Sequence, residues 1–261
     1  MDLQLEGKRA LVTGGSRGIG KAIARVLAEE GCEVAISARD PERLAAASTE
    51  VGAKAWFSCE MSDDESVETM VNDAAAALGG LDILVNNAAS PGSVHGPLPL
   101  SELTADHALA DLQVKVLGYL RCARSAAPHM QRAGWGRIIN ISGLAARGSG
   151  NTVGSIRNVS VAALTKNLAD ELGPDGINVT VVHPGLTRTE ATPERIAQIA
   201  EANEISLEAA EARMAAGNSV RTLIDSDDIA NIVAFLASPK SIAITGDTIA
   251  AGGGVGRGIY Y

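Results

Sequence analysis

Aromatic residues are scarce in this sequence: they make up 3% of the 261 residues, whereas hydrophobic residues as a whole make up 46%. The core must therefore be built mainly from alanine, valine, isoleucine and leucine. That composition suits a buried parallel sheet covered by helices. A chain of this length can bury one large core, and we expect a single domain that spans residues 1–261.

Cysteine is also rare. The three cysteines, Cys32, Cys59 and Cys122, show no metal-ligand spacing, and their odd number gives no complete disulfide framework. We interpret them as reduced core residues, and we predict no metal site.

Basic residues are outnumbered, with 22 Lys and Arg against 31 Asp and Glu and a net charge of −9. This balance argues against a nucleic-acid partner, although a local basic pocket could still hold phosphate. No apolar run approaches the roughly 18 residues that a transmembrane helix needs. Residues 1–4 also lack the basic start of a signal peptide. We therefore expect a soluble, cytoplasmic protein with no membrane partner.

A glycine-rich turn near the N-terminus is the first positive signal. Residues 10–12 form a short apolar run, glycines follow at positions 14, 15, 18 and 20, and apolar residues then recur at helical spacing through residue 27. A helix that begins there offers unpaired backbone N–H groups to an anion, and glycines let the backbone approach a pyrophosphate closely. The segment predicts a phosphate site, and its alternative interpretation is a flexible turn.

Strands and helices alternate along the whole chain, which argues for right-handed crossovers and a parallel sheet. After the first strand, the predicted strands cover residues 33–38, 54–59, 81–85, 137–141 and 178–183, with a final edge strand after 245–249. The predicted helices cover residues 40–51, 63–78, 101–131, 152–172 and 226–237. Residues 187–216 are polar, alanine-rich and helical by pattern, and we interpret them as a substrate lid or else a plain surface hairpin of helices.

Three short motifs resemble those of the short-chain dehydrogenase/reductase family. They are Thr13-Gly14-Gly15-Ser16-Arg17-Gly18-Ile19-Gly20, Asn86-Asn87-Ala88-Ala89 and Pro184-Gly185-Leu186-Thr187. The resemblance runs from Thr13 to Gly253 and implies a doubly wound Rossmann-type α/β fold, with about seven parallel strands flanked by helices on both faces. It also implies a homodimer or homotetramer and a small-molecule substrate.

The resemblance further implies a nicotinamide cofactor at the carboxyl ends of the strands. The predicted cofactor-binding residues are Gly14, Ser16, Arg17, Gly18, Ile19, Arg39, Glu60, Met61, Asn87, Ala88, Ala89, Pro184, Gly185 and Thr187. Glu60 stands where the family usually has an Asp beside the adenine. Arg39, just past the second strand, and Arg17 lie where a dinucleotide fold selects a 2′-phosphate or a 2′-hydroxyl. They favour NADP(H) over NAD(H), unless Arg39 is an ordinary surface arginine.

The family's reaction centre is changed in this chain. The family uses a Tyr as acid/base, a Lys four residues later, a Ser and an Asn. Counting back from the matching segment 164–172 places Gly154 at the Tyr position and Asn158 at the Lys position, and the chain contains no Tyr-x-x-x-Lys. The Ser position falls on Gly143, directly after Ser142, and the Asn position falls on Lys115. The resemblance therefore predicts an atypical active site.

Ser142, Lys115 and Asn158 are the catalytic candidates that remain. Lys115 can donate a proton or polarise a carbonyl, and in the alternative interpretation it forms an ion pair with Asp111 one helical turn earlier.

Two further cations near these positions have alternative interpretations. Arg157 is a clamp for carboxylate or phosphate, or else a solvated or interface arginine. His95 is a catalytic acid/base, or else a solvated loop residue.

Two functions remain open at this point. The first is an oxidoreductase, because the family's activity is hydride transfer. It would act on a small carbonyl, alcohol or activated alkene through an atypical proton donor. The second is a protein that keeps the fold without redox chemistry: a lyase, an isomerase, or an inactive binding or regulatory subunit.

Overall fold

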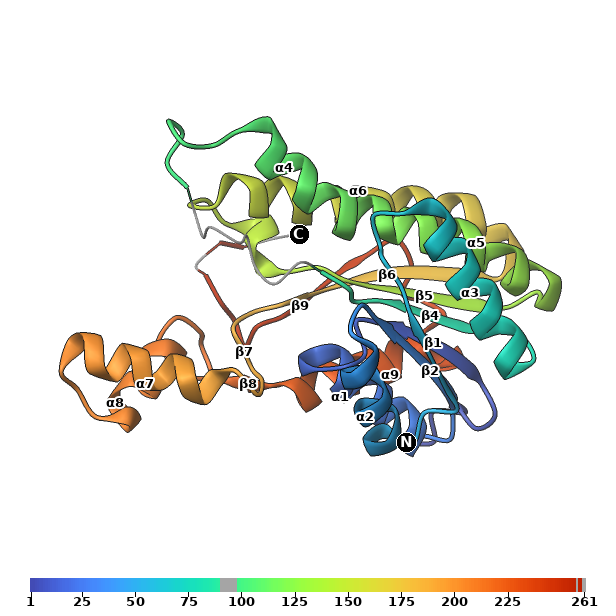
Figure 1. Cartoon of the computed structure of the whole chain (residues 1–261), viewed down its shortest axis with the longest axis horizontal. Helices are drawn as coiled ribbons and strands as arrows, with labels where there is room; N and C mark the ends of the chain where they lie inside the picture. Colours follow the sequence, from blue (N-terminus) through green and yellow to red (C-terminus); the bar gives the residue numbers. More distant parts are fainter. Residues whose placement is uncertain (90–97, 257, 260–261) are drawn as a thin grey trace.

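The computed structural model describes residues 1–89, 98–256, 258 and 259, and its centre is a parallel sheet of seven strands (Figure 1). The strands are β1 (Arg9–Thr13), β2 (Glu33–Ala38), β3 (Ala55–Ser58), β4 (Ile83–Asn86), β5 (Gly136–Ile141), β6 (Ile177–Pro184) and β9 (Thr248–Ala251). Their order across the sheet is β3-β2-β1-β4-β5-β6-β9. The predicted α/β fold is therefore confirmed. The order reverses between β1 and β4, which is where sheets of this type bind their ligands.

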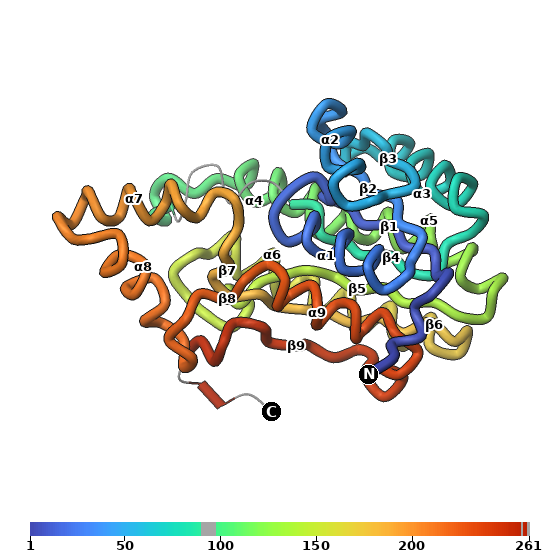
Figure 2. Tube along the Cα trace, turned by 90° about the horizontal axis from the view of Figure 1, so that it is seen from below, coloured from blue at the N-terminus to red at the C-terminus, as the bar shows by residue number. Residues whose placement is uncertain are grey.

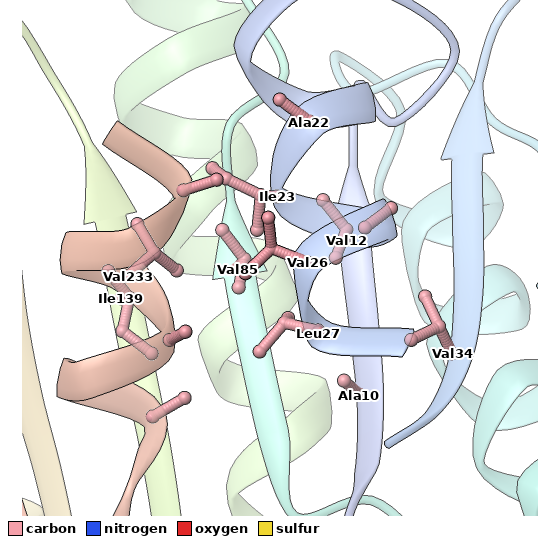
Figure 3. Packing of buried hydrophobic residues seen from close by; sticks show 14 of the residues in the cluster. Ala10, Val12, Ala22, Ile23, Val26, Leu27, Val34, Val85, Ile139 and Val233 are labelled. Carbon is pink, nitrogen blue, oxygen red and sulfur yellow. The ribbon is translucent and has the colours of Figure 1, made fainter. Parts of the chain in front are cut away.

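Helices cover both faces of the sheet (Figure 1). One face carries α1 (Gly18–Glu29), α2 (Pro41–Val51) and α9 (Ser226–Ala237), and the other carries α3 (Asp64–Leu78), α5 (Gly118–Ala133) and α6 (Thr152–Leu172). Figure 3 shows the first of these two cores, in which Ile23 and Leu27 of α1 pack against Val12, Val85 and Val233. Burying one such side chain stabilises the fold by about 1.5–3 kcal/mol. The core is thus built from small aliphatic side chains, as the scarcity of aromatic residues requires.

Local sequence signals set the ends of α2. The carboxylate of Asp40 accepts a hydrogen bond from the backbone N–H of Arg43 at 3.1 Å, and Pro41 occupies the first helical turn. Gly52 ends the helix in the left-handed conformation, with φ at 67°. These residues fix where α2 begins and ends, and so they fix the position of Arg39 in the short connection between β2 and α2.

A polar network ties the ends of the central strands together. Asn86 donates from Nδ2 to Oδ1 of Asn140 at 2.9 Å, and Asn140 donates from its own Nδ2 to the hydroxyl of Thr165 on α6 at 2.9 Å. All three residues are fully buried. Because the network links β4, β5 and α6, it holds in place the edge of the sheet on which the candidate site lies.

The helix predicted over residues 101–131 runs from Ala105 to Ala133 without a break, but it contains a π-helical segment that was not predicted. The first part, α4 (Ala105–Leu112), begins after Thr104, whose hydroxyl accepts from the backbone of His107 at 3.4 Å. A π-helical segment, η1 (Gln113–Leu117), then leads into α5. A π-helical turn shifts the facing of the residues within it, and periodicity of apolar residues does not reveal such a shift. Lys115 lies in this segment, and it is only 6% exposed.

The segment predicted as a lid, 187–216, contains two helices. They are α7 (Thr192–Asn203) and α8 (Leu207–Ala215), which pack on each other around a small apolar core and project from the sheet (Figure 2). At the base of this projection, β7 (Thr187–Arg188) pairs with β8 (Ile224–Asp225) in a separate two-stranded sheet. Closure of this segment over a substrate stays a prediction.

The three cysteines are buried and form no disulfide, which confirms their interpretation as core residues. Desolvation raises the pKa of the Cys32 thiol to about 12 and therefore disfavours its reactive thiolate. Across the described ranges, no helix has the length and apolar character required to cross a membrane.

Candidate active site

Two cavities lie side by side at the carboxyl ends of the strands. The larger one, of about 1040 Å³, extends from the glycine turn to α2, and we call it the glycine-turn cavity. The smaller one, of about 590 Å³, lies between the end of β5, η1 and α6, and we call it the Lys115 cavity. Ile19, Asn87 and Ala89 line both of them, so the two cavities meet near the end of β4.

Two glycines allow the turn to close tightly on the end of β4. A Cβ atom on Gly20 would lie 2.3 Å from the carbonyl oxygen of Gly14, and a Cβ on Gly14 would lie 2.8 Å from Nδ2 of Asn87. That Nδ2 donates to the carbonyl oxygens of Thr13 and Gly14, each at 3.1 Å. The backbone therefore forms a cradle, at the N-terminus of α1, that side chains would fill. Such a cradle fits the pyrophosphate of a dinucleotide.

An anionic side chain already occupies this helix end. Both carboxylate oxygens of Glu190 accept from the backbone N–H of Gly18, at 3.0 and 3.3 Å. The positive end of the helix dipole favours a negative charge there. A pyrophosphate bound at the same N–H group has to displace the carboxylate. Glu190 was missed from the sequence because it lies 172 residues from Gly18.

Glu190→Gln is expected to tighten NADPH binding by about three- to tenfold, because an amide competes less well than a carboxylate for the helix end. The measurement is the Kd by titration calorimetry. Glu194→Gln, an exposed change in the first turn of α7, is the matched control and should leave the Kd unchanged. An unchanged or weaker affinity in Glu190→Gln would show that the carboxylate does not compete with the cofactor.

Three arginines, Arg17, Arg39 and Arg43, line the glycine-turn cavity. Arg17 is the N-cap residue of α1, and Arg39 is exposed just past β2. Arg43 forms a loose ion pair with Asp40, at 3.6 Å. Arg43 was not among the predicted cofactor residues, although it lies in the first turn of α2 and lines the same cavity.

Most predicted cofactor residues line the glycine-turn cavity. These are Gly14, Ser16, Arg17, Gly18, Ile19, Arg39, Glu60, Met61, Asn87, Ala88 and Ala89. The carboxylate of Glu60 is engaged locally, since it accepts from the backbone N–H of Ser62 at 3.2 Å and from its hydroxyl at 2.8 Å.

The loop after β6 contributes residues to both cavities. Pro184 and Gly185 line the Lys115 cavity, but Thr187 lines neither cavity, because its hydroxyl donates to the carbonyl oxygen of Gly185 at 3.1 Å. Thr189 lines the glycine-turn cavity instead, with its methyl group 3.5 Å from the place of a Cβ on Gly18. Residues of a strand-end loop point in directions that spacing alone does not give.

Lys115 is buried in the wall of the smaller cavity. Its Nζ donates to the carbonyl oxygen of Ser142, at the end of β5, at 3.0 Å. Burial, with a smaller contribution from the charge of Arg157, lowers the pKa of Lys115 to about 7, whereas Asp111 acts in the opposite direction. A lysine with this pKa can both hold and release a proton near neutral pH.

The predicted alternative of an ion pair between Lys115 and Asp111 was wrong. Asp111 instead accepts from Nη1 of Arg157 at 2.9 Å, and the two side chains are only 8% and 13% exposed. Arg157 is therefore not the solvated arginine of the alternative interpretation. Residues four apart, such as Asp111 and Lys115, lie side by side on an α-helix, but here the π-helical segment η1 begins at residue 113 and changes their relative facing.

Ser142 and Asn158 hold each other at the base of the cavity. The hydroxyl of Ser142 donates to Oδ1 of Asn158 at 3.1 Å, and both residues are buried. Gly154, at the Tyr position, lies in the first turn of α6, where its N–H donates to Asn151 at 2.8 Å. Since Gly154 has no side chain, it brings no acid/base group. Lys115, Ser142 and Asn158 line one cavity.

His183 lies behind this site, buried at the end of β6. Its Nδ1 accepts from the backbone N–H of Gly143 at 3.1 Å. Burial lowers the pKa of His183 to about 4, and Arg147 and Lys115 act in the same direction, so the imidazole is neutral at pH 7. His183 is therefore a packed strand-end residue. His95 falls outside the described residues.

Comparison with known proteins places these features in context. A family model described as enoyl-(acyl carrier protein) reductase matches residues 14–256. Cis-4-hydroxycyclohexanecarboxylate dehydrogenase of Sinomonas cyclohexanicum is 34% identical over 250 residues, which cover 94% of this chain and 95% of that protein. L-Sorbose reductase of Gluconobacter frateurii, solved with NADPH and L-sorbose, aligns with a TM-score of 0.90 and 26% identity over 98% of both chains. A 3-ketoacyl-(acyl-carrier-protein) reductase of Brucella melitensis, solved with NADH, aligns with a TM-score of 0.83 and 28% identity, over 96% of this chain and 99% of that one.

Proposed function

The chain belongs to the short-chain dehydrogenase/reductase family of NAD(P)-dependent oxidoreductases, and from this premise we propose that it interconverts a small carbonyl compound and its alcohol with NADP(H). The residues present fit the cofactor. The glycine cradle of Gly14 and Gly20 leaves the backbone open to a pyrophosphate, and the N-terminus of α1 already attracts the carboxylate of Glu190.

The preference for NADP(H) rests on the arginines of the glycine-turn cavity. Arg17, Arg39 and Arg43 bring positive charge to the wall where a 2′-phosphate is recognised in dinucleotide folds. Glu50 also lines this cavity, but its carboxylate pairs with Lys21. One of the similar structures contains NADPH and another contains NADH, so these relatives do not decide between the two cofactors. The preference for NADP(H) therefore rests on the charges of this chain.

A proton donor is the second requirement of carbonyl reduction. When bound, the nicotinamide supplies or accepts the hydride. The carbonyl oxygen then needs a proton, and Lys115 is the group placed to give it. The observation that carries the proposal is the buried Nζ of Lys115, held 3.0 Å from the carbonyl of Ser142 in the wall of the reaction cavity, with a pKa of about 7. During reduction, Nζ gives up a proton to the substrate oxygen and recovers it from solvent. Reduction of an activated alkene stays within the same proposal, because it demands less of the protein at oxygen.

Assembly into a homodimer or homotetramer is part of the proposal. Apolar side chains stand exposed along α4, η1, α5 and α6, at Leu109, Leu117, Leu120, Ile156 and Val159, which are between 36% and 54% exposed. An apolar surface of this kind on neighbouring helices is typical of a subunit interface.

Gly154 at the Tyr position supports a second candidate, a protein that retains the cofactor site without redox turnover. Oxidation of NADPH, followed by absorbance with a panel of small ketones, aldehydes and activated alkenes, separates the two. The proposed oxidoreductase turns over with at least one of these classes. Cofactor binding without turnover in every class would favour the lyase, isomerase or binding-subunit alternative.

A further inference from the structure

The Lys115 cavity carries positive charge. Within the described part of the chain, Lys115 and Arg157 are the two charged residues that line it, and the other lining residues are apolar or neutral. Asp111 balances one of these charges, but it lies behind Arg157 and does not line the cavity. A cavity with this charge favours an anion over a neutral guest of the same size.

Arg157 has donors to spare. A guanidinium group carries five N–H bonds. One nitrogen, Nη1, donates to Asp111, whereas Nε is buried and finds no hydrogen-bond partner among the described residues. Buried donors in native proteins are nearly always satisfied, so the orphaned Nε leaves this guanidinium with unused hydrogen-bonding capacity beside the cavity.

The ion pair also makes Arg157 rigid. Asp111 on α4 holds the guanidinium from one side, and α6 carries it from the other. The next residue, Asn158, accepts a hydrogen bond from the hydroxyl of Ser142. The carbonyl oxygen of Ser142 in turn accepts a hydrogen bond from Lys115. Arg157 and Lys115 therefore line the same cavity, together with Ser142 and Asn158.

We propose that the Lys115 cavity selects substrates that carry a carboxylate, which Arg157 binds while Lys115 faces the reacting carbonyl or alcohol oxygen. The substrate class is accordingly a small oxo acid or hydroxy acid, and this assignment rests on the proposed function. A planar guanidinium matches a carboxylate in both shape and charge. A phosphate dianion fits less well, because its second charge would hold the neighbouring Lys115 protonated and oppose proton release.

The test compares two probes of nearly the same size and shape, of which only the first is charged: cyclohexanecarboxylate and cyclohexanecarboxamide. Each is titrated by calorimetry into the protein alone and into the protein saturated with NADP⁺. We expect the carboxylate to bind about tenfold or more tightly than the carboxamide. In the double variant Asp111→Asn/Arg157→Gln, which removes both partners of the buried pair together, this selectivity should fall to about twofold or less.

A matched control comes from the same helix. The double variant Lys166→Gln/Asp170→Asn removes an exposed ion pair of α6 and should keep the full selectivity. Equal affinity for the two probes in the unmodified protein would overturn the proposal, as would tighter binding of methyl phosphate. Selectivity that persists in Asp111→Asn/Arg157→Gln would overturn the role of Arg157. If that variant does not fold, the comparison of probes in the unmodified protein still decides.

Failure of this inference and failure of the proposed function give different results. If the carboxylate is preferred but NADPH is consumed with no carbonyl compound, the anion site stands and the oxidoreductase proposal fails. If NADPH reduces neutral ketones as well as oxo acids, the oxidoreductase proposal stands and the carboxylate selectivity is refuted.

Discussion

Replacing Lys115 with methionine is expected to lower kcat/KM for carbonyl reduction by about 10²–10⁴-fold, the usual effect of removing a positioned general acid. Arg157, the other charged residue of the cavity wall in the described ranges, is held in its ion pair with Asp111 and does not replace Lys115. Methionine keeps the length and apolar volume of the side chain, so the Ser142 carbonyl loses one donor while the packing is conserved. The measurement is steady-state kinetics with NADPH and the best substrate of the carbonyl panel.

The pH dependence of the same reaction separates a chemical role of Lys115 from a structural one. Reduction needs protonated Lys115, so its rate should fall as the pH rises through about 7, and alcohol oxidation should show the opposite trend. Lys115→Met should lose this inflection, whereas the exposed control Lys166→Met should keep it. Unchanged turnover in Lys115→Met would make the lysine a structural residue.

Stability provides a second check on this variant. Burial lowers the pKa of Lys115 from 10.5 to about 7, so between these values the folded chain binds fewer protons than the unfolded chain. The contribution of Lys115 to stability therefore improves as the pH rises from about 7 to 10.5 and is unfavourable below that window. Lys115→Met is accordingly expected to melt at the same temperature or higher at pH 6, which excludes unfolding as the cause of lost activity.

Arg39→Asp is expected to weaken NADPH binding by about 10–100-fold, the effect of removing one charge-assisted contact to a phosphate. NADH should lose little affinity, because an Asp at this position can accept from a ribose 2′-hydroxyl. Calorimetric titration of both cofactors measures the ratio of their affinities. The neutral variant Arg39→Gln should lose NADPH affinity without gaining any for NADH. An equal loss of both cofactors in Arg39→Asp would remove the reason for preferring NADP(H).

The sequence predicted the fold well, because local signals and the global arrangement agree. The glycines at 14 and 20 indicate a turn in which the backbone packs too closely for side chains, and Asp40 and Gly52 mark the ends of α2. Apolar runs of four to eight residues between helical patterns gave six of the seven strands within a few residues. The prediction that Gly154 stands at the family's Tyr position depends only on register, so the sequence alone could make it.

The contacts at the site could not be predicted in the same way. Asp111 and Arg157 lie 46 residues apart, and the ion pair exists because α4 and α6 come together in the fold. The π-helical segment that turns Lys115 toward Ser142 leaves no mark in the pattern of apolar residues. Glu190 reaches Gly18 only because the loop after β6 crosses the N-terminus of α1. Side-chain partners thus depended on tertiary packing, even where the elements that carry them were foreseen.

Calorimetric titration of the unmodified protein with NADPH and with NADH tests most directly the central claim, which is that the chain binds NADP(H). The account predicts that NADPH binds with one site per chain and more tightly than NADH, because the arginines of the glycine-turn cavity recognise the 2′-phosphate. Binding of neither cofactor would contradict it: the fold would then serve a role outside NADP(H) chemistry, and the glycine-turn cavity would lose its assignment.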